Sequence, residues 1–164
     1  MQDVEKYVEK NVKKWNKVEN YSYFCHTINQ MWEMTGFFGK HSAKIDDKGR
    51  LVIPSAIKNV VPADQMEFVI RKDMYSDCLE MYTFSEWERQ SEEVRSRLNP
   101  AFNESHAKFW RAYMHNCAIV EPDAKLGRIS IPKKLLEMIG VTKEVVFSGN
   151  DYKIEIWAKE KFES

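Results

Sequence analysis

The stretch "DDKGRLVIP" at 46–54 occurs again in slightly altered form, as "DAKLGRISIP" at 123–132. Arg50 and Arg128, the arginines of the two copies, are 78 positions apart (128 − 50). In each copy a polar turn ends in Gly-Arg, and the apolar run that follows stops at a proline, where strand pairing is expected to end. The sequence therefore predicts two related halves, each with a turn followed by a short strand.

The likeness between the halves continues beyond these turns. Each copy is followed by a short helical segment and then by two apolar segments that suit a β-hairpin: "MEFVIRK" and "CLEMYTF" in the first half, "KEVVFSG" and "YKIEIW" in the second. A repeat of roughly 45 residues is too small to bury a satisfactory core alone, so the halves must share one. We expect an α+β fold in which strands of both halves interleave into a small β-barrel with pseudo-two-fold symmetry and peripheral helices.

Helical patterns lie before and between the halves. An apolar stripe that includes Trp15 predicts an amphipathic helix near the N-terminus. Ser85 and Glu88 have the spacing of a capping box at the start of a helix, and a second helix is expected over 103–115. We expect four regions, which are a partly helical N-terminal extension (1–36), a first half (37–88), connecting helices (89–116) and a second half (117–164).

The amino-acid composition limits the classes of function that this protein can have. With 25 basic and 25 acidic residues the formal net charge is zero, so any nucleic-acid site must be a local basic cluster. Three widely spaced cysteines without a CxxC pair favour free thiols in a reducing, intracellular setting, and no metal site. The first residues carry acids and lack a signal-peptide core, and no apolar run reaches membrane-span length, which favours a cytoplasmic protein without a membrane partner.

The chain shows no catalytic signature. Asp46 and Asp47 are adjacent carboxylates whose side chains are expected to point apart, and the four histidines form no known metal or nucleophile–base motif. Gly-rich phosphate loops are also missing from the sequence. We therefore expect neither an enzyme nor a cofactor.

The two Gly-Arg turns are the candidate site. Glycine suits the positive φ or bulge expected there, and each arginine, held at the start of a strand, can fork onto a phosphate or a guanine edge. The alternative is that each arginine only pairs with its own turn acid and ties the loop together. The expected turn-forming residues are Asp46, Gly49, Asp123 and Gly127. The expected DNA-binding residues are Lys40, Lys44, Lys48, Arg50, Lys125, Arg128 and Lys133.

Two copies of the motif, each followed by Ile-Pro and a matching hairpin, together with "CLEMYTFSEWE" (78–88) and "LNPAFNESHAKFWRAYMHNCAIVE" (98–121), resemble the MraZ family of transcriptional regulators. The resemblance covers nearly all of the chain from Phe37 onward. It implies tandem SpoVT-AbrB swapped-hairpin halves in a bacterial, nucleoid-associated regulator of the division and cell-wall gene cluster. Such a regulator binds short direct repeats in double-stranded DNA upstream of its own operon and forms a ring-like homo-oligomer.

The family resemblance leaves room for another role. The same fold in an oligomeric protein-interaction module, or an antitoxin-like partner, would act on another protein, such as the ribosomal-RNA methyltransferase encoded beside these regulators.

The sequence departs from the family pattern in two places. Asp46 lies four residues before Arg50, as the family's Asp-x-x-Gly-Arg pattern requires, but Ala124 occupies that position before Arg128 and the acid is Asp123. Either the second turn contains an extra residue or the second motif has lost its acid. Family chains generally begin near the position of Met34, so residues 1–33 are either a lineage-specific extension or an upstream start.

Overall fold

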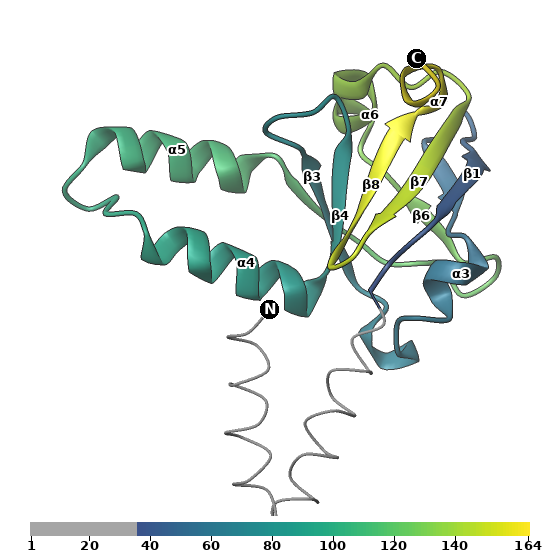
Figure 1. Ribbon diagram of the computed structural model, residues 1–164, viewed down its shortest axis with the longest axis horizontal. Coiled ribbons are helices and arrows are strands. Elements are labelled where there is room, and N and C mark those ends of the chain that lie inside the picture. Colours follow the sequence, from purple (N-terminus) through teal and green to yellow (C-terminus); the bar gives the residue numbers. More distant parts are fainter. Residues whose placement is uncertain (1–35) are drawn as a thin grey trace, which may run out of the picture. The chain divides into compact units, whose positions relative to one another are not determined.

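The computed structural model describes residues 36–164, shown in Figure 1. The N-terminal amphipathic helix expected from the sequence lies outside these residues. The strands are β1 (Lys40–Lys44), β2 (Arg50–Val52), β3 (Phe68–Lys72), β4 (Leu79–Thr83), β5 (Cys117–Val120), β6 (Arg128–Ser130), β7 (Glu144–Asn150) and β8 (Lys153–Ala158). The helices are α3 (Ser55–Lys58), the 3-10 turn η1 (Ala63–Gln65), α4 (Phe84–Ser96), α5 (Glu104–His115), α6 (Lys133–Ile139) and α7 (Lys159–Phe162).

The strands of the two halves interleave. Six of them form an antiparallel sheet in the order β1-β7-β8-β4-β3-β5, and β2 pairs with β6 in a separate two-stranded ribbon. If each strand of the first half is exchanged for its counterpart in the second, β1 for β5 and so on to β4 for β8, the sheet order is simply reversed. This is the arrangement that a two-fold axis between β4 and β8 produces. The α+β class and the interleaved, pseudo-symmetric halves are confirmed.

The expected barrel is wrong in one respect, because the sheet does not close. β1 and β5 are its two edge strands and do not pair with each other in the part of the chain described here. The ribbon is not hydrogen-bonded into the sheet as a continuous ladder, and its strands are only three residues long. Side-chain packing completes the enclosure instead: the ribbon and helices α3 and α6 cover the apolar face of the open sheet.

One core serves both halves. Along β3 and β8, alternate residues such as Phe68, Ile70, Ile154 and Ile156 are fully or almost fully buried on the same side of the sheet. They belong to one cluster with residues of the ribbon and of both short helices: Leu51, Ile53, Ile57, Ile129, Ile131, Leu135, Leu136 and Ile139. Burying each large aliphatic side chain contributes about 1.5–3 kcal/mol before the entropy cost, so neither half has a complete core without the other.

The helices begin near the expected positions. The helix expected over 103–115 is α5, and Asn103 caps it by accepting a hydrogen bond from the backbone N–H of His106. At α4 the expected cap, Ser85, is two residues late: Thr83 is the N-cap and accepts from the N–H of Glu86. Both sites have the same Ser/Thr-x-x-Glu spacing, and the strand decides between them, because β4 ends at Thr83 and the chain turns there.

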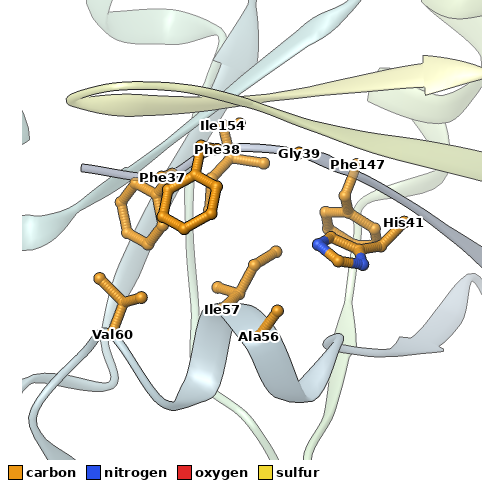
Figure 2. Close-up of a pocket in the computed structure, with 10 residues that line it drawn as sticks. Phe37, Phe38, Gly39, His41, Ala56, Ile57, Val60, Phe147 and Ile154 are labelled. Carbon is orange, nitrogen blue, oxygen red and sulfur yellow. The ribbon is translucent and has the colours of Figure 1, made fainter. Parts of the chain in front are cut away.

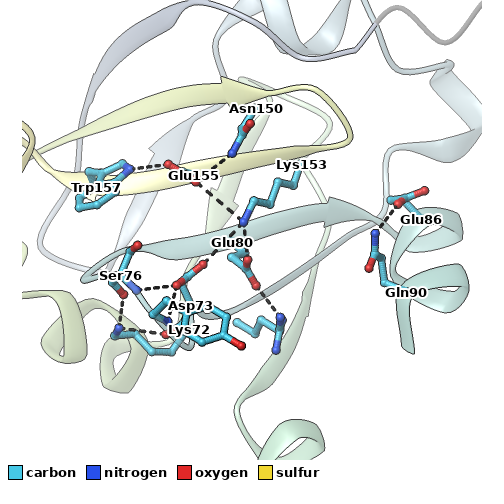
Figure 3. A network of polar contacts seen from close by, with 12 residues as sticks. Lys72, Asp73, Ser76, Glu80, Glu86, Gln90, Asn150, Lys153, Glu155 and Trp157 are labelled. Atoms are coloured by element: carbon cyan, nitrogen blue, oxygen red, sulfur yellow. Dashed lines mark hydrogen bonds and ion pairs between the residues drawn. The ribbon is translucent and has the colours of Figure 1, made fainter. Parts of the chain in front are cut away.

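The outer face of the sheet carries a network of charges, shown in Figure 3. Glu80 of β4 and Glu155 of β8 are directly opposite each other across the two strands that flank the pseudo-two-fold axis. Lys153 lies between them, with its Nζ 2.6 Å from Glu80 Oε1 and 3.8 Å from Glu155 Oε1. The Nη2 of Arg71 lies 2.6 Å from the other carboxylate oxygen of Glu80, Oε2. At the junction between the halves, two carboxylates thus face each other, and neighbouring cations neutralise them.

Candidate functional site

The first Gly-Arg turn is organised by one carboxylate. Asp46 Oδ1 accepts hydrogen bonds from the backbone N–H groups of Lys48 and Arg50, both at 2.9 Å, and Oδ2 accepts one from Arg50 Nε at 2.8 Å. The backbone N–H of Arg50 is the main cause that holds the pKa of Asp46 below its ordinary value of 3.8. The turn acid therefore stays ionised and fixes the direction in which the Arg50 guanidinium leaves the strand.

The second turn has the same design with one more residue. Asp123 Oδ1 accepts from the N–H of Leu126, and Oδ2 accepts from Arg128 Nε, both at 2.7 Å. These donors hold the pKa of Asp123 well below its ordinary value, the Leu126 N–H contributing most. Of the two alternatives left open by the shifted acid, the structure shows the longer turn with its acid retained.

The glycines connect each turn to the opposite half. Gly49 and Gly127 have φ values of +76° and +64°, in the left-handed region that favours glycine. The carbonyl of Gly49 accepts a hydrogen bond from the N–H of Ile131, and the carbonyl of Gly127 accepts one from Ile53. These bonds extend the ribbon at both ends, so a turn contributed by one half is held in place by the strand of the other.

Pairing of β2 with β6 brings both arginines to one face of the ribbon. Arg50 is opposite Ser130, and Val52 is opposite Arg128. Because side chains alternate along a strand, these four residues point to one face, while Leu51 and Ile129 point to the core and are 1% and 0% exposed. The two arginines occupy diagonal corners of this outward face, at a Cα separation of about 7–8 Å for diagonal neighbours of an antiparallel pair.

Each arginine uses only one of its guanidinium N–H groups to bind its turn aspartate. Their side chains are 36% and 26% exposed, and each meets its aspartate through Nε alone. Within residues 36–164 the terminal amino groups of Arg50 and Arg128 make no hydrogen bond. Two forks of N–H donors are thus oriented and remain available on one surface.

Most of the lysines expected in the site flank this ribbon. Lys48 and Lys133 line one groove beside the first turn. The Nζ of Lys133 also lies 3.7 Å from Oε1 of Glu137. Lys40 and Lys44 of β1 line a second groove together with Val52. Lys125 is exposed in the second turn. The structure therefore gathers the expected residues around one ribbon, although Lys40 also lies over the ring of Phe162.

Sequence reasoning missed four residues of this surface. Lys58 of α3 lines the groove beside Val52 and lies against Gly127, and Lys143 lines the groove beside the first turn. Val52 and Ser130 complete the outward face of the ribbon. The alternation of Arg-Leu-Val and Arg-Ile-Ser could have indicated Val52 and Ser130, whereas Lys58 and Lys143 join this surface only through tertiary contacts.

A third concavity lies between β1 and α3 (Figure 2). It has a volume of about 170 Å³, and its lining is apolar apart from the imidazole of His41. One histidine without an acid or nucleophile beside it is not an acid–base pair. Within the described part of the chain, no cluster of three potential metal ligands is found, and none of the helices is long and apolar enough to cross a membrane.

Fold and site together define a class: an α+β protein of two interleaved halves, with two carboxylate-braced arginines on one exposed ribbon. A family model described as "MraZ protein, putative antitoxin-like" matches residues 37–108 and 114–164. Similar proteins named transcriptional regulator MraZ occur in Bacteroides thetaiotaomicron (39% identity over 131 residues, 79% of this chain and 83% of the relative) and Acetivibrio thermocellus (34% over 128 residues, 78% and 85%). A relative with the same name in Christiangramia forsetii is 37% identical over 133 residues, 79% of this chain and 83% of the relative. The chain belongs to the MraZ family.

Proposed function

We propose that this protein is a transcriptional regulator that binds double-stranded DNA through the outward face of the β2–β6 ribbon. The observation that carries the proposal is the position of Arg50 and Arg128 on one exposed face, each braced through Nε by a turn carboxylate. A guanidinium held in this way presents its two terminal amino groups together, which is the geometry that binds the O6 and N7 of guanine or a phosphate.

A two-stranded β-ribbon fits the major groove of B-DNA, which is about 12 Å wide. The separation of about 7–8 Å between the diagonal corners corresponds to roughly two base-pair steps of 3.4 Å. With the ribbon in the groove, lysines on both sides face the phosphate backbones: Lys40, Lys44, Lys48, Lys58, Lys125 and Lys133. Phosphate contacts of this kind position the protein, and the bases read by the ribbon provide specificity.

The proposed targets are short direct repeats upstream of the division and cell-wall gene cluster, including the chain's own operon. Repeated sites suit a homo-oligomer, proposed as a ring, because linked binding events raise the overall affinity. The hairpin of α4 and α5 is a candidate contact between copies. It extends away from the sheet (Figure 1), α4 has no buried residue, and Phe102, Phe109 and Met114 are exposed.

The test is fluorescence-anisotropy binding to a duplex from upstream of the gene and to a scrambled duplex, over a series of salt concentrations. Loss of one bidentate arginine contact costs about 1–3 kcal/mol, so Arg50→Ala and Arg128→Ala should each weaken specific binding about 5- to 150-fold. Each phosphate that a variant no longer neutralises reduces the salt slope by about 0.9. Arg97→Ala removes an exposed arginine from the end of α4 and is the matched control once gel filtration shows the same oligomeric state as the wild type. Equal binding to both duplexes, unchanged in the Arg50 and Arg128 variants, would contradict the proposal.

A second candidate function is binding to another protein, in an antitoxin-like role such as action on a methyltransferase encoded nearby. The groove between α4 and α5 favours it: Trp87, Trp110 and Met114 line this groove, and the buried Nε1 of Trp87 has no hydrogen-bond partner within residues 36–164. If Trp110→Ala abolishes the regulatory effect in cells while Arg50→Ala and Arg128→Ala do not, protein binding is the better account.

A further inference from the structure

The pseudo-two-fold axis runs through the middle of the ribbon. Leu51 and Ile129 are equivalent in the two repeats and are also paired with each other across the ribbon. The outward face therefore has two ends that would be identical in a symmetric protein. At one end Arg50 lies opposite Ser130, and at the other Arg128 lies opposite Val52.

The residues beside the arginines break this symmetry. Val52 and Ser130 occupy equivalent positions in the repeats, but one ends in two methyl groups and the other in a hydroxyl. Both are exposed, and Val52 shows 46% of its surface to solvent. An apolar side chain is thus present on the proposed DNA-facing surface at one end of the ribbon only.

The chemistry of the major groove distinguishes these two side chains. The 5-methyl group of thymine is the one apolar group on a base edge there, and apolar side chains read thymine by contacting it. A serine hydroxyl donates or accepts and so fits either kind of polar base edge. Val52 also lines the groove that carries Lys40, Lys44 and Lys58, where phosphate contacts would bring the duplex against it.

We propose that Val52 is a specificity-determining residue that contacts a thymine 5-methyl group beside the base read by Arg128. Because Ser130 cannot make this contact at the other end, the two ends of the ribbon read different bases, and the preferred site of one protomer is asymmetric. The inference rests on the DNA-binding function proposed above and adds which base the ribbon selects and with which side chain.

The experiment uses the full chain and two steps. Selection from a random duplex library first defines the preferred site. Each thymine of that site is then replaced in turn by deoxyuridine, which lacks only the 5-methyl group, and binding is measured by anisotropy. Burial of a single methyl group corresponds to about three- to fivefold in affinity. We expect one thymine at which deoxyuridine weakens wild-type binding by that amount, and a Val52→Ala protein that is insensitive to the same replacement.

Two further sets of variants sharpen the test. Ser130→Ala and Ile119→Ala should keep the deoxyuridine sensitivity; Ile119 is an exposed residue of edge strand β5 and is not part of the ribbon. Val52→Ser makes the two ends alike and should select a site with a two-fold symmetric centre. Thermal melts identify any variant that fails to fold, and exposed Val52 gives little reason for such failure.

The outcomes separate the inference from the function on which it rests. Sequence-selective binding without any thymine whose methyl effect depends on residue 52, or a symmetric site selected by the wild type, overturns the inference and leaves the DNA-binding function standing. Selection that yields no preferred sequence overturns both.

Discussion

Replacing Lys153 by methionine tests whether the two halves are joined through their charged junction. Lys153 is 12% exposed, and its Nζ lies 2.6 Å from Glu80 Oε1, 3.6 Å from Asp73 Oδ2 and 3.8 Å from Glu155 Oε1 (Figure 3). Burial opposes its charge, but the hydrogen bond to Glu80 and the surrounding carboxylates raise the pKa of Lys153 above its ordinary value. The ammonium is therefore a fixed cation between strands β4 and β8.

Methionine fills a similar volume but leaves Glu80 and Glu155 facing each other with less compensation. Removing one partner of a buried ion pair costs about 3–5 kcal/mol. We expect a loss near the lower end of this range, because the side chain of Glu80 is only 5% exposed but keeps its ion pair with Arg71. The matched control is Lys159→Met, which breaks the ion pair with Glu144, where both side chains are more exposed, at 37% and 28%. Exposed pairs contribute little, because water screens the two charges.

The assay is urea unfolding followed by far-UV circular dichroism at neutral pH and equal protein concentration. Added salt should reduce the small effect of Lys159→Met more than that of Lys153→Met, because buried charges are screened less. If both variants lose the same free energy of unfolding, the charged junction does not hold the halves together and the reasoning is refuted.

Three further predictions concern the turns and a buried thiol. Gly49→Ala should destabilise more than Gly127→Ala: both face a positive φ cost of about 1–2 kcal/mol, but the new Cβ meets a backbone oxygen 2.9 Å away at Gly49 and a flexible lysine side chain at Gly127. Equal urea midpoints for the two variants would contradict this. The pKa values of Asp46 and Asp123 are lowered in the folded state, so their stabilisation is present above the ordinary value of 3.8 and is lost as pH falls toward the folded values. The double variant Asp46→Asn, Asp123→Asn should therefore show a smaller loss of stability on acidification below about pH 5, and an unchanged pH profile would count against it. Burial raises the pKa of Cys78 to about 12, so its peptide should stay unlabelled by N-ethylmaleimide at pH 8 until the protein is unfolded, as read by mass spectrometry. Rapid labelling of the native protein would show that the site opens.

The local parts of the fold were readable from the sequence. The repeat itself indicated two halves that must share a core, and the turn, strand and hairpin signals around Gly49 and Gly127 lie within a few residues of the structures they specify. The hairpin strands β3, β4, β7 and β8 formed where the apolar runs predicted them. The prediction placed the N-cap of α4 at Ser85 because two Ser/Thr-x-x-Glu pairs overlap there. Thr83 is the N-cap because β4 ends at this residue.

The features that depend on contacts between the halves are strand register, the common face of the arginines and the open sheet, and only the tertiary structure shows them. No local pattern specifies that Arg50 pairs with Ser130, so nothing in the sequence placed both arginines on one face or brought Lys58 against Gly127. The open sheet has the same origin, because closure depends on whether two edge strands meet. Turn and helix signals are encoded by neighbouring residues, whereas register and enclosure follow from packing between segments separated by more than one repeat, which sequence spacing does not measure.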